Sequence, residues 1–292
     1  MSVHPHRREG PSGQRELALA LVITASMMGV EFIAGLASGS LALLADAGHM
    51  LTDASALTLS LFAAWIAARA PTPGKTYGYY RTEILTALVN GVAMWLIVVW
   101  IYARAMQRLQ HPPEVQTGLM LFAAALGLVA NFASSQILMR ASTQSLNVRG
   151  AQLHVLGDAL GSCGVIVAGI LMRLKGWRLA DPLASLFVGL LIAGSSWILI
   201  KQAVTVLLEA TPHHVDIVRL TDELRAIEGI REVHDLHVWT ITTGLEAMSG
   251  HLIVDRLERG PKILHAVNAL LRDQFNITHT TFQLEPTQSE QK

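Results

Sequence analysis

Residues 45–58 read ADAGHMLTDASALT and place a histidine and two aspartates inside an apolar run that is long enough to span a membrane. His49 and Asp53 are four residues apart, so on a helix they lie one above the other on the same face. An ionised aspartate at the centre of a bilayer costs on the order of 2.5 to 3.5 kcal/mol. The stretch therefore predicts a membrane helix whose acidic side chains need a compensating partner.

The same spacing returns about a hundred residues later, in the apolar segment HVLGDALGS at 154–162. Two imidazoles and two carboxylates from two helices form a tetrahedral set that suits a divalent metal such as zinc. The alternative is that each pair is an internal hydrogen bond, but the repetition in two separate segments favours a metal. We predict a site made of His49, Asp53, His154 and Asp158.

The composition is that of a membrane protein. Hydrophobic residues make up 51% and charged residues 15% of the chain, against about 25% charged residues in an ordinary soluble domain. Six apolar runs are each long enough for one helical span: 17–38, 41–68, 84–106, 117–139, 151–173 and 180–201. We therefore predict an α-helical membrane protein with a flexible tail at 1–16 and a six-helix transmembrane domain at 17–211.

The basic residues near the ends of these runs indicate the orientation. With six spans both termini share one side, which collects nine Lys and Arg: Arg7, Arg8, Arg15, Arg69, Lys75, Arg81, Arg140, Arg149 and Lys201. The other side has five: Arg104, Arg108, Arg173, Lys175 and Arg178. Because cytoplasmic loops carry more Lys and Arg, both termini are predicted to be cytoplasmic. In a bacterium this would be the inner, or cell, membrane.

Three further acids lie in the apolar runs. Glu31 is expected either to stabilise a polar neighbour or to lie on a proton path. Asp46 is close to the His49 face but one turn nearer the outer end, so we expect it to be reached by water and either to support a metal ligand or to lie on the entry path. Asp181 precedes Pro182, which predicts an N-cap with proline at the first helical position.

The long apolar runs end before Thr211. Residues 212–286 are therefore predicted to form a soluble domain, followed by a short tail at 287–292. Its periodicity predicts a small α+β domain with helices on one face of a sheet. The expected elements are a helix at 214–227, strands at 233–242 and 246–254, a helix at 261–275 and a strand at 278–285.

Several histidines of this domain suit a second metal site. His234 and His237 would point to opposite faces of a regular strand, and only a bulge would bring them to one face. His279 and Glu285 are six apart on the last strand and share a face. We expect a candidate cytoplasmic-domain site made of His234, His251, His279 and Glu285. The alternative is a set of solvated surface histidines.

Several function classes are disfavoured. A single cysteine allows neither an intrachain disulfide nor a cysteine-built zinc site. The formal net charge of zero gives no indication of a nucleic-acid partner. An intramembrane zinc enzyme remains an alternative, but the sequence has no HExxH motif. A membrane metal sensor whose soluble domain does the work is the other alternative.

The paired motifs, their positions in the second and fifth of six spans, and the C-terminal α+β domain together resemble the cation diffusion facilitator family. The sequence motifs ADAGHMLTD, HVLGD, ADP and VHDLHVW are most similar to its zinc-exporting branch. The resemblance runs from about residue 17 to residue 286.

The resemblance implies a homodimeric zinc and proton antiporter that is not an enzyme, has a ferredoxin-like cytoplasmic domain and exports zinc from the cytoplasm across the lipid bilayer. It carries no prosthetic group, and zinc is its transported and regulatory ion. The transport site of the family falls on His49, Asp53, His154 and Asp158. Its soluble-domain sites map onto His234, His251 and Glu285.

Overall fold

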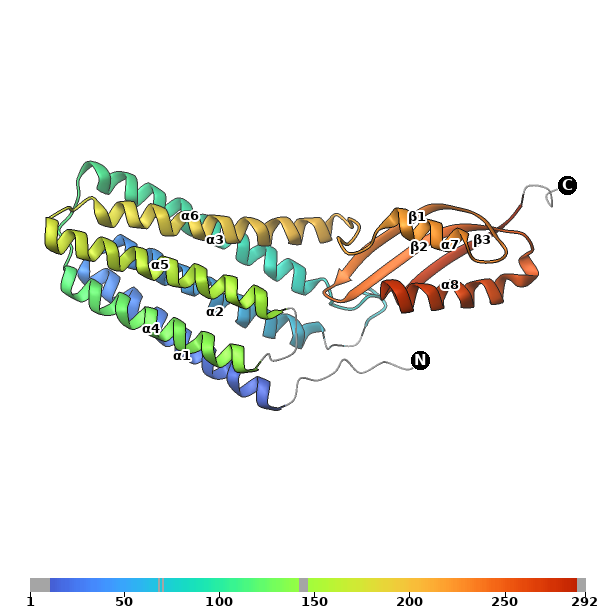
Figure 1. The fold of residues 1–292 in the computed structure, drawn as a ribbon, viewed down its shortest axis with the longest axis horizontal. Helices are drawn as coiled ribbons and strands as arrows, with labels where there is room; N and C mark the ends of the chain where they lie inside the picture. Colours follow the sequence, from blue (N-terminus) through green and yellow to red (C-terminus); the bar gives the residue numbers. More distant parts are fainter. Residues whose placement is uncertain (1–10, 68, 70, 142–146, 288–292) are drawn as a thin grey trace. The chain divides into compact units, whose positions relative to one another are not determined.

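The computed structural model describes residues 11–67, 69, 71–141 and 147–287. For 11–21, 135, 138–141, 147–158 and parts of 52–67 it describes the backbone alone. The chain forms two compact units, one from the segments up to 62 and from 89 to 200, the other from 63–88 and from 201 onward (Figure 1). The prediction of a flexible tail at 1–16 lies outside the described residues for 1–10 and is wrong for 11–16, which belong to a helix.

Six long helices build the first unit and continue at some ends into the second. They are α1 (Pro11–Ser38), α2 (Leu41–Ala67), α3 (Thr82–Gln110), α4 (Thr117–Ala141), α5 (Asn147–Lys175) and α6 (Ala180–Leu207). Each contains nearly all of one predicted apolar run and extends up to six residues beyond it. The extension at the end of α3, QRLQ at 107–110, is polar, whereas the extension at the end of α6, QAVTVL at 202–207, is largely apolar.

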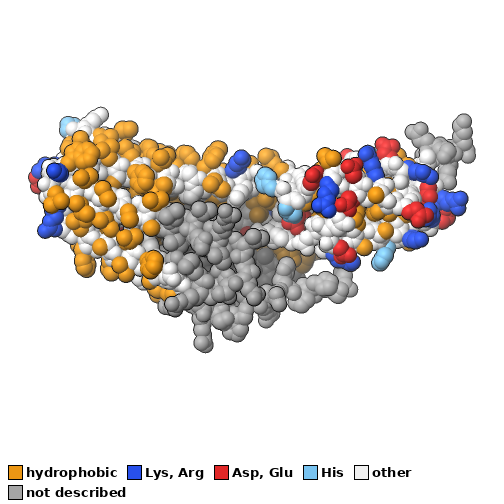
Figure 2. All heavy atoms as spheres, in the orientation of Figure 1, with side chains coloured by type: hydrophobic (Ala, Val, Ile, Leu, Met, Phe, Trp, Pro, Cys, Tyr) orange, Lys and Arg blue, Asp and Glu red, His pale blue; other side chains and the backbone are white. Residues whose placement is uncertain are grey.

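The membrane character is visible on the surface of the helices. Three described segments are long and apolar enough to cross a membrane: Thr82–Gln110, Thr117–Ser134 and Ala180–Leu207. Val22–Ser38 and Leu41–Leu51 are shorter apolar stretches, so six spans remain a prediction. Hydrophobic side chains are numerous on the visible face of the helices where their residues are described (Figure 2). Such a surface is stable in lipid and not in water.

The core of the first unit takes buried apolar residues from all six helices. Small residues alternate with large ones, so the helices approach closely. Representative members, one from each helix, are Ala34, Leu43, Val98, Met120, Val165 and Val188.

We expected Asp181 to cap its own helix, but it lies inside the first turn of α6. Its carboxylate instead accepts hydrogen bonds from the start of α2: the backbone N–H of Leu41 at 2.9 Å and of Ala42 at 3.2 Å, and the Ser40 hydroxyl at 2.6 Å. Arg108 of α3 forms an ion pair with it at 3.2 Å. Free N–H groups at a helix start attract a carboxylate from any part of the chain, so one buried acid joins α2, α3 and α6.

The second unit contains a three-stranded sheet with two helices. Its elements are α7 (Ile217–Arg225), β1 (Ile230–Thr242), β2 (Leu245–Val254), the 3-10 turn η1 (Leu257–Arg259), α8 (Gly260–Phe275) and β3 (His279–Pro286). All five predicted elements agree with these bounds within three residues. The strand order is β1-β2-β3, with β1 antiparallel and β3 parallel to β2.

Both helices cover one face of the sheet. Leu220 and Leu224 of α7, and Val267 of α8, pack in one buried cluster with Met248 and Leu252 of β2. Met248 and Leu252 are an even number of residues apart, so they lie on the same side of the strand. The odd-numbered residues of β2 therefore face away from the helices, and this open face holds the histidines.

Candidate metal centres

The four predicted transport ligands lie on α2 and α5. The backbone places His49 and Asp53 one turn apart on α2, and His154 and Asp158 one turn apart on α5. The His49 side chain is buried, with 7% exposed. The side chains of Asp53, His154 and Asp158 lie outside the described residues, so the meeting of the four ligands stays a prediction.

A described hydrogen bond joins α2 and α5 about one helical turn from the predicted ligands His49 and Asp158. The Ser162 hydroxyl of α5 donates to the Asp46 carboxylate of α2 at 2.9 Å. A Cβ added at Gly161 would lie 3.0 Å from the other Asp46 oxygen, so this glycine leaves the room that the carboxylate occupies. Asp46 is 1% exposed. Our expectation that water reaches Asp46 was therefore wrong, because a polar side chain of the neighbouring helix takes the place of water.

Glu31 of α1 is the most enclosed acid of the described helices, with 0% exposed. Neither of its carboxylate oxygens has a hydrogen-bond partner among the described residues. It lies against Gly127 of α4, where an added Cβ would come within 1.8 Å of a Glu31 oxygen. The glycine thus forms the recess that accepts this side chain.

The second candidate centre lies on the open face of the sheet. His234 of β1 pairs in register with His251 of β2, and both rings approach Glu285 of β3. His234 Nε2 lies 3.1 Å and His251 Nδ1 lies 2.8 Å from the carboxylate. Ligand atoms of the three residues all lie within 4.8 Å of one another. Two imidazoles and a carboxylate are a common zinc-ligand set.

A bulge in β1 enlarges this cluster. The register shifts between His234 and His237, and Asp235 takes the left-handed conformation with φ of 51°. Both histidines consequently lie on the open face. His237 Nε2 is 3.0 Å from Asp235 Oδ1, and His251 Nε2 is 3.8 Å from Asp235 Oδ2. The sequence indicated that a bulge would be needed, but Asp235 was not recognised as part of the cluster.

A small residue on the neighbouring strand makes room for the bulge. Leu236 joins the buried cluster of the sheet domain, and a Cβ added at Gly250 would lie 2.7 Å from its side chain. Gly250 therefore lets Leu236 pack inward while the polar residues before and after it face outward.

The electrostatics of the cluster favour a charged carboxylate. The hydrogen bond from His234 lowers the pKa of Glu285, and hydrogen bonds from His251 and Gln283 act in the same direction, while burial opposes them. The carboxylate therefore stays ionised to lower pH than an ordinary glutamate. An ionised carboxylate is the form that binds a metal ion.

His279 does not join the other three predicted ligands. It pairs in register with Ala247, whereas Glu285 pairs with Ile253. Six residues along a strand span about 20 Å, so sharing a face does not bring two side chains to one ion. The His279 ring instead contacts Tyr77, with the ring centroids 5.5 Å apart.

Comparison with known proteins shows the family. Residues 17–208 match the family described as the cation efflux transmembrane domain, and residues 212–287 match the cation efflux protein, cytoplasmic domain. The "Cadmium, cobalt and zinc/H(+)-K(+) antiporter" of Bacillus velezensis is 40% identical over 287 residues, covering 97% of this chain and 91% of that protein. The "Zinc transporter ZitB" of Escherichia coli K12 is 41% identical over 273 residues, covering 93% and 87%.

Among solved structures, the metal-bound C-terminal domain of the CzcD transporter from Cuprividus metallidurans is similar, with 32% identity and a TM-score of 0.23. It covers 24% of this chain and 99% of that one. The curated relatives are transporters and not enzymes, and two family matches together span nearly the whole sequence. The chain is therefore a membrane transporter of the cation efflux, or cation diffusion facilitator, family.

Proposed function

We propose that this protein exports zinc from the cytoplasm in exchange for protons, through a tetrahedral site of His49, Asp53, His154 and Asp158 between α2 and α5. Two relatives named as a zinc transporter and as a cadmium, cobalt and zinc/H(+)-K(+) antiporter support the substrate and the exchange. The functional form is a homodimer with six spans and both termini in the cytoplasm.

The observation that carries the site is the hydrogen bond from Ser162 to Asp46. Consecutive helices reverse direction, so α2 and α5 are antiparallel (Figure 1). Starting from this contact, His49 lies about 4.5 Å further along α2, and Asp158 lies about 6 Å away in the same direction along α5. Asp53 and His154 follow at about 10 and 12 Å. Each predicted ligand of one helix thus has a predicted ligand of the other at a similar depth.

Proton coupling follows from the chemistry of these ligands. A metal ion binds deprotonated imidazole and carboxylate, so zinc and protons compete for the same four side chains. Zinc that enters from the cytoplasm releases protons, and protons that return from the other side release zinc. Rocking of the helices around a fixed site would expose it to the two sides in turn.

Zinc flux into proteoliposomes tests this function. The wild type should move zinc when a proton gradient is applied and lose that flux when the gradient is dissipated. Asp53→Ala and Asp158→Ala should abolish flux while the protein stays folded, and Asp273→Ala, on an exposed aspartate of the sheet domain, should transport normally. Normal flux in either of the first two variants would overturn the site.

We propose a regulatory role for the second centre, because the ligand atoms of His234, His251 and Glu285 already lie within 4.8 Å of one another. Zinc bound there would tighten the dimer and shift the population of transport states. This centre is built on the sheet and not on the helices that carry the transport ligands. Its loss should therefore change the zinc concentration at which transport begins, and not the transported ion.

A further inference from the structure

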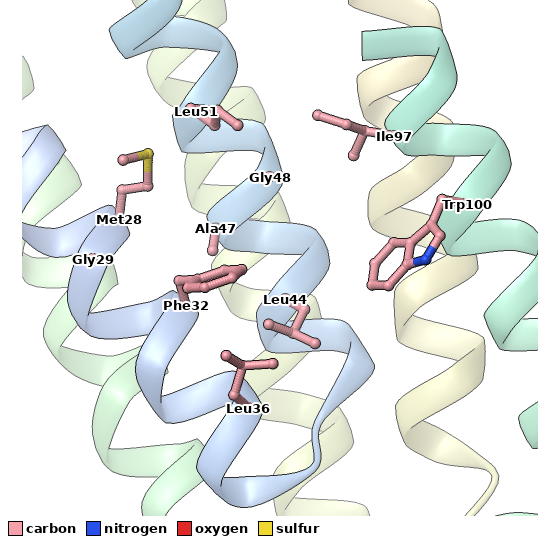
Figure 3. A pocket seen from close by; sticks show the side chains of 10 residues that line it. All are labelled: Met28, Gly29, Phe32, Leu36, Leu44, Ala47, Gly48, Leu51, Ile97 and Trp100. Carbon is pink, nitrogen blue, oxygen red and sulfur yellow. The ribbon is translucent and has the colours of Figure 1, made fainter. Parts of the chain in front are cut away.

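A groove outside both candidate centres lies between α1, α2 and α3 (Figure 3). Its cavity volume is about 380 Å³, which is within the range of pockets that hold small ligands. The lining is apolar throughout and consists of Met28, Gly29, Phe32, Leu36, Leu44, Ala47, Gly48, Leu51, Ile97 and Trp100. Leu36, Phe32 and Trp100 are themselves 60%, 53% and 47% exposed, so the groove opens to the surroundings of the helices.

The groove continues into a second cavity with a polar end. This cavity, of about 320 Å³, shares Leu36, Leu44 and Trp100 with the groove and extends to Arg104, Gln107 and Arg108. From Ile97 to Arg104 the helix rises about 10 Å. The two cavities together form one continuous apolar groove with basic residues at one end.

Arg104 is the available cation at this end. Arg108 is held by the Gly39 carbonyl at 2.6 Å and by Asp181 at 3.2 Å. Arg104 is exposed, and its contacts in the described part of the chain are a long hydrogen bond to Gln107 at 3.4 Å and the Trp100 ring at 6.0 Å. No acidic side chain of the described residues pairs with it. An arginine near the end of an apolar helix can donate paired hydrogen bonds to a phosphate group.

The approach of two helices at the floor of the groove bears on what can occupy it. A Cβ added at Gly48 of α2 would lie 3.4 Å from a methyl group of Ile97 on α3, so α2 and α3 come close together there. A helix from another chain is about 10 Å across and would not reach this floor. A single hydrocarbon chain is narrow enough, and its anionic head would lie where Arg104 is.

We propose that this groove binds one acyl chain of an anionic phospholipid, with the headgroup phosphate held by Arg104 and the Gln107 amide. The site is independent of the transport ligands and of the sheet-domain cluster. The bound lipid would pack α1 and α2 against α3.

Native mass spectrometry of the full-length, delipidated protein tests the proposal with palmitoyl-oleoyl phosphatidylglycerol and with phosphatidylcholine that has the same chains. The wild type should bind phosphatidylglycerol more tightly. Arg104→Gln should weaken that lipid about fivefold, which corresponds to roughly 1 kcal/mol for one hydrogen bond, and should weaken phosphatidylcholine less, because its choline cation already offsets the phosphate charge. Arg173→Gln, on an exposed arginine at the end of α5, is the matched control.

A second variant fills the groove. A Cβ added at Gly29 meets no atom within 4 Å, so Gly29→Leu places a side chain in the groove without disturbing the backbone and should lower binding of both lipids. Gly194→Leu, at a glycine of α6 with equally open space, should bind both normally. Inorganic phosphate should not compete, because the acyl chain supplies most of the binding.

Three outcomes would overturn the proposal. One is equal binding of the two lipids by the wild type. Another is unchanged phosphatidylglycerol binding in both Arg104→Gln and Gly29→Leu. The third is a Gly29→Leu protein that dissociates into monomers while its lipid binding is unchanged, because the groove would then be an interface between copies of the chain.

Discussion

The helical unit and the sheet domain place similar acidic side chains in opposite surroundings. Asp46 and Asp181 of the helical unit are each 1% exposed, and each is held by a neighbouring helix. The Glu285 side chain of the sheet domain is 29% exposed and is held by two histidines on an open face. An ion can reach the sheet cluster directly from solvent, whereas a site at the buried His49 exchanges an ion only if helices move. The difference agrees with the transport that we propose for the first unit and the regulatory zinc binding that we propose for the second.

The largest loss of stability is expected from Asp181→Ala in the helical unit. The change removes the acceptor for the first N–H groups of α2 and leaves the partly buried Arg108 without its ion-pair partner. Breaking a buried pair in this way costs about 3 to 5 kcal/mol. Thermal unfolding in detergent should show the loss, and zinc flux should fall with it.

An exposed ion pair of the same unit provides the control for Asp181→Ala. Glu114 pairs with Arg178, and its side chain is 81% exposed. Glu114→Gln should cost less than about 1 kcal/mol. Equal destabilisation by the two variants would contradict the cap that we assign to Asp181.

A smaller loss of stability is expected from Gly127→Ala. The new methyl group would occupy the recess of Glu31 and force the carboxylate to move within packed helices, which costs about 1 to 3 kcal/mol. Glu31→Ala in the same chain should recover part of the loss, because the two residues are in contact. Gly194→Ala, where the added atom meets nothing within 4 Å, should be neutral in the same unfolding assay. If Glu31→Ala gives no recovery, the recess is not what Gly127 provides.

Glu285→Gln should weaken zinc binding to the sheet domain without unfolding it. We expect a loss of affinity on the order of 100-fold, at the upper end of what removal of a supporting group already costs at metal sites. Isothermal titration should be done in the Asp158→Ala background, so that zinc bound at the predicted transport site does not contribute. Acidification should also lower the affinity, since the ligands must be deprotonated. Glu258→Gln, on an exposed glutamate outside the cluster, should titrate like the parent.

The smallest effect is expected from His279→Ala. His279 contacts Tyr77 and is about 20 Å along the strand from Glu285, so zinc affinity of the sheet cluster should not change. The same titration measures it. A tenfold loss in this variant would return His279 to the metal site and remove the distinction between the two ends of β3.

The elements of the sheet domain were predictable because hydrophobic periodicity depends on near neighbours in the chain. The stripe of Ile263, Val267, Leu271 and Phe275, for example, repeats every four residues and defines the buried face of α8. The long helices were predictable for the same reason. The count of membrane spans is not settled by the described segments and stays a prediction.

The contacts of the acidic side chains could not be predicted, because their partners lie far away in the sequence. Asp181 followed local rules for an N-cap, yet the helix that it caps begins 140 residues earlier, at Leu41. Asp46 was expected to meet water, but Ser162 of another helix supplies the hydrogen bond. Asp235, which takes the left-handed conformation, lies beside Leu236, and the side chain of Leu236 packs against Gly250 on the next strand.

The position of Asp181 also bears on the order in which the protein is made. The ribosome synthesises α2 early, but the carboxylate that binds its first N–H groups emerges only with α6, the last of the long helices. In a nascent chain that stops before residue 181, the Ser40 hydroxyl can already accept from the Leu43 N–H, but the Leu41 and Ala42 N–H groups at the start of this helix lack their carboxylate acceptor. The arrangement links completion of the start of α2, the helix that carries two of the proposed transport ligands, to translation of the last long helix.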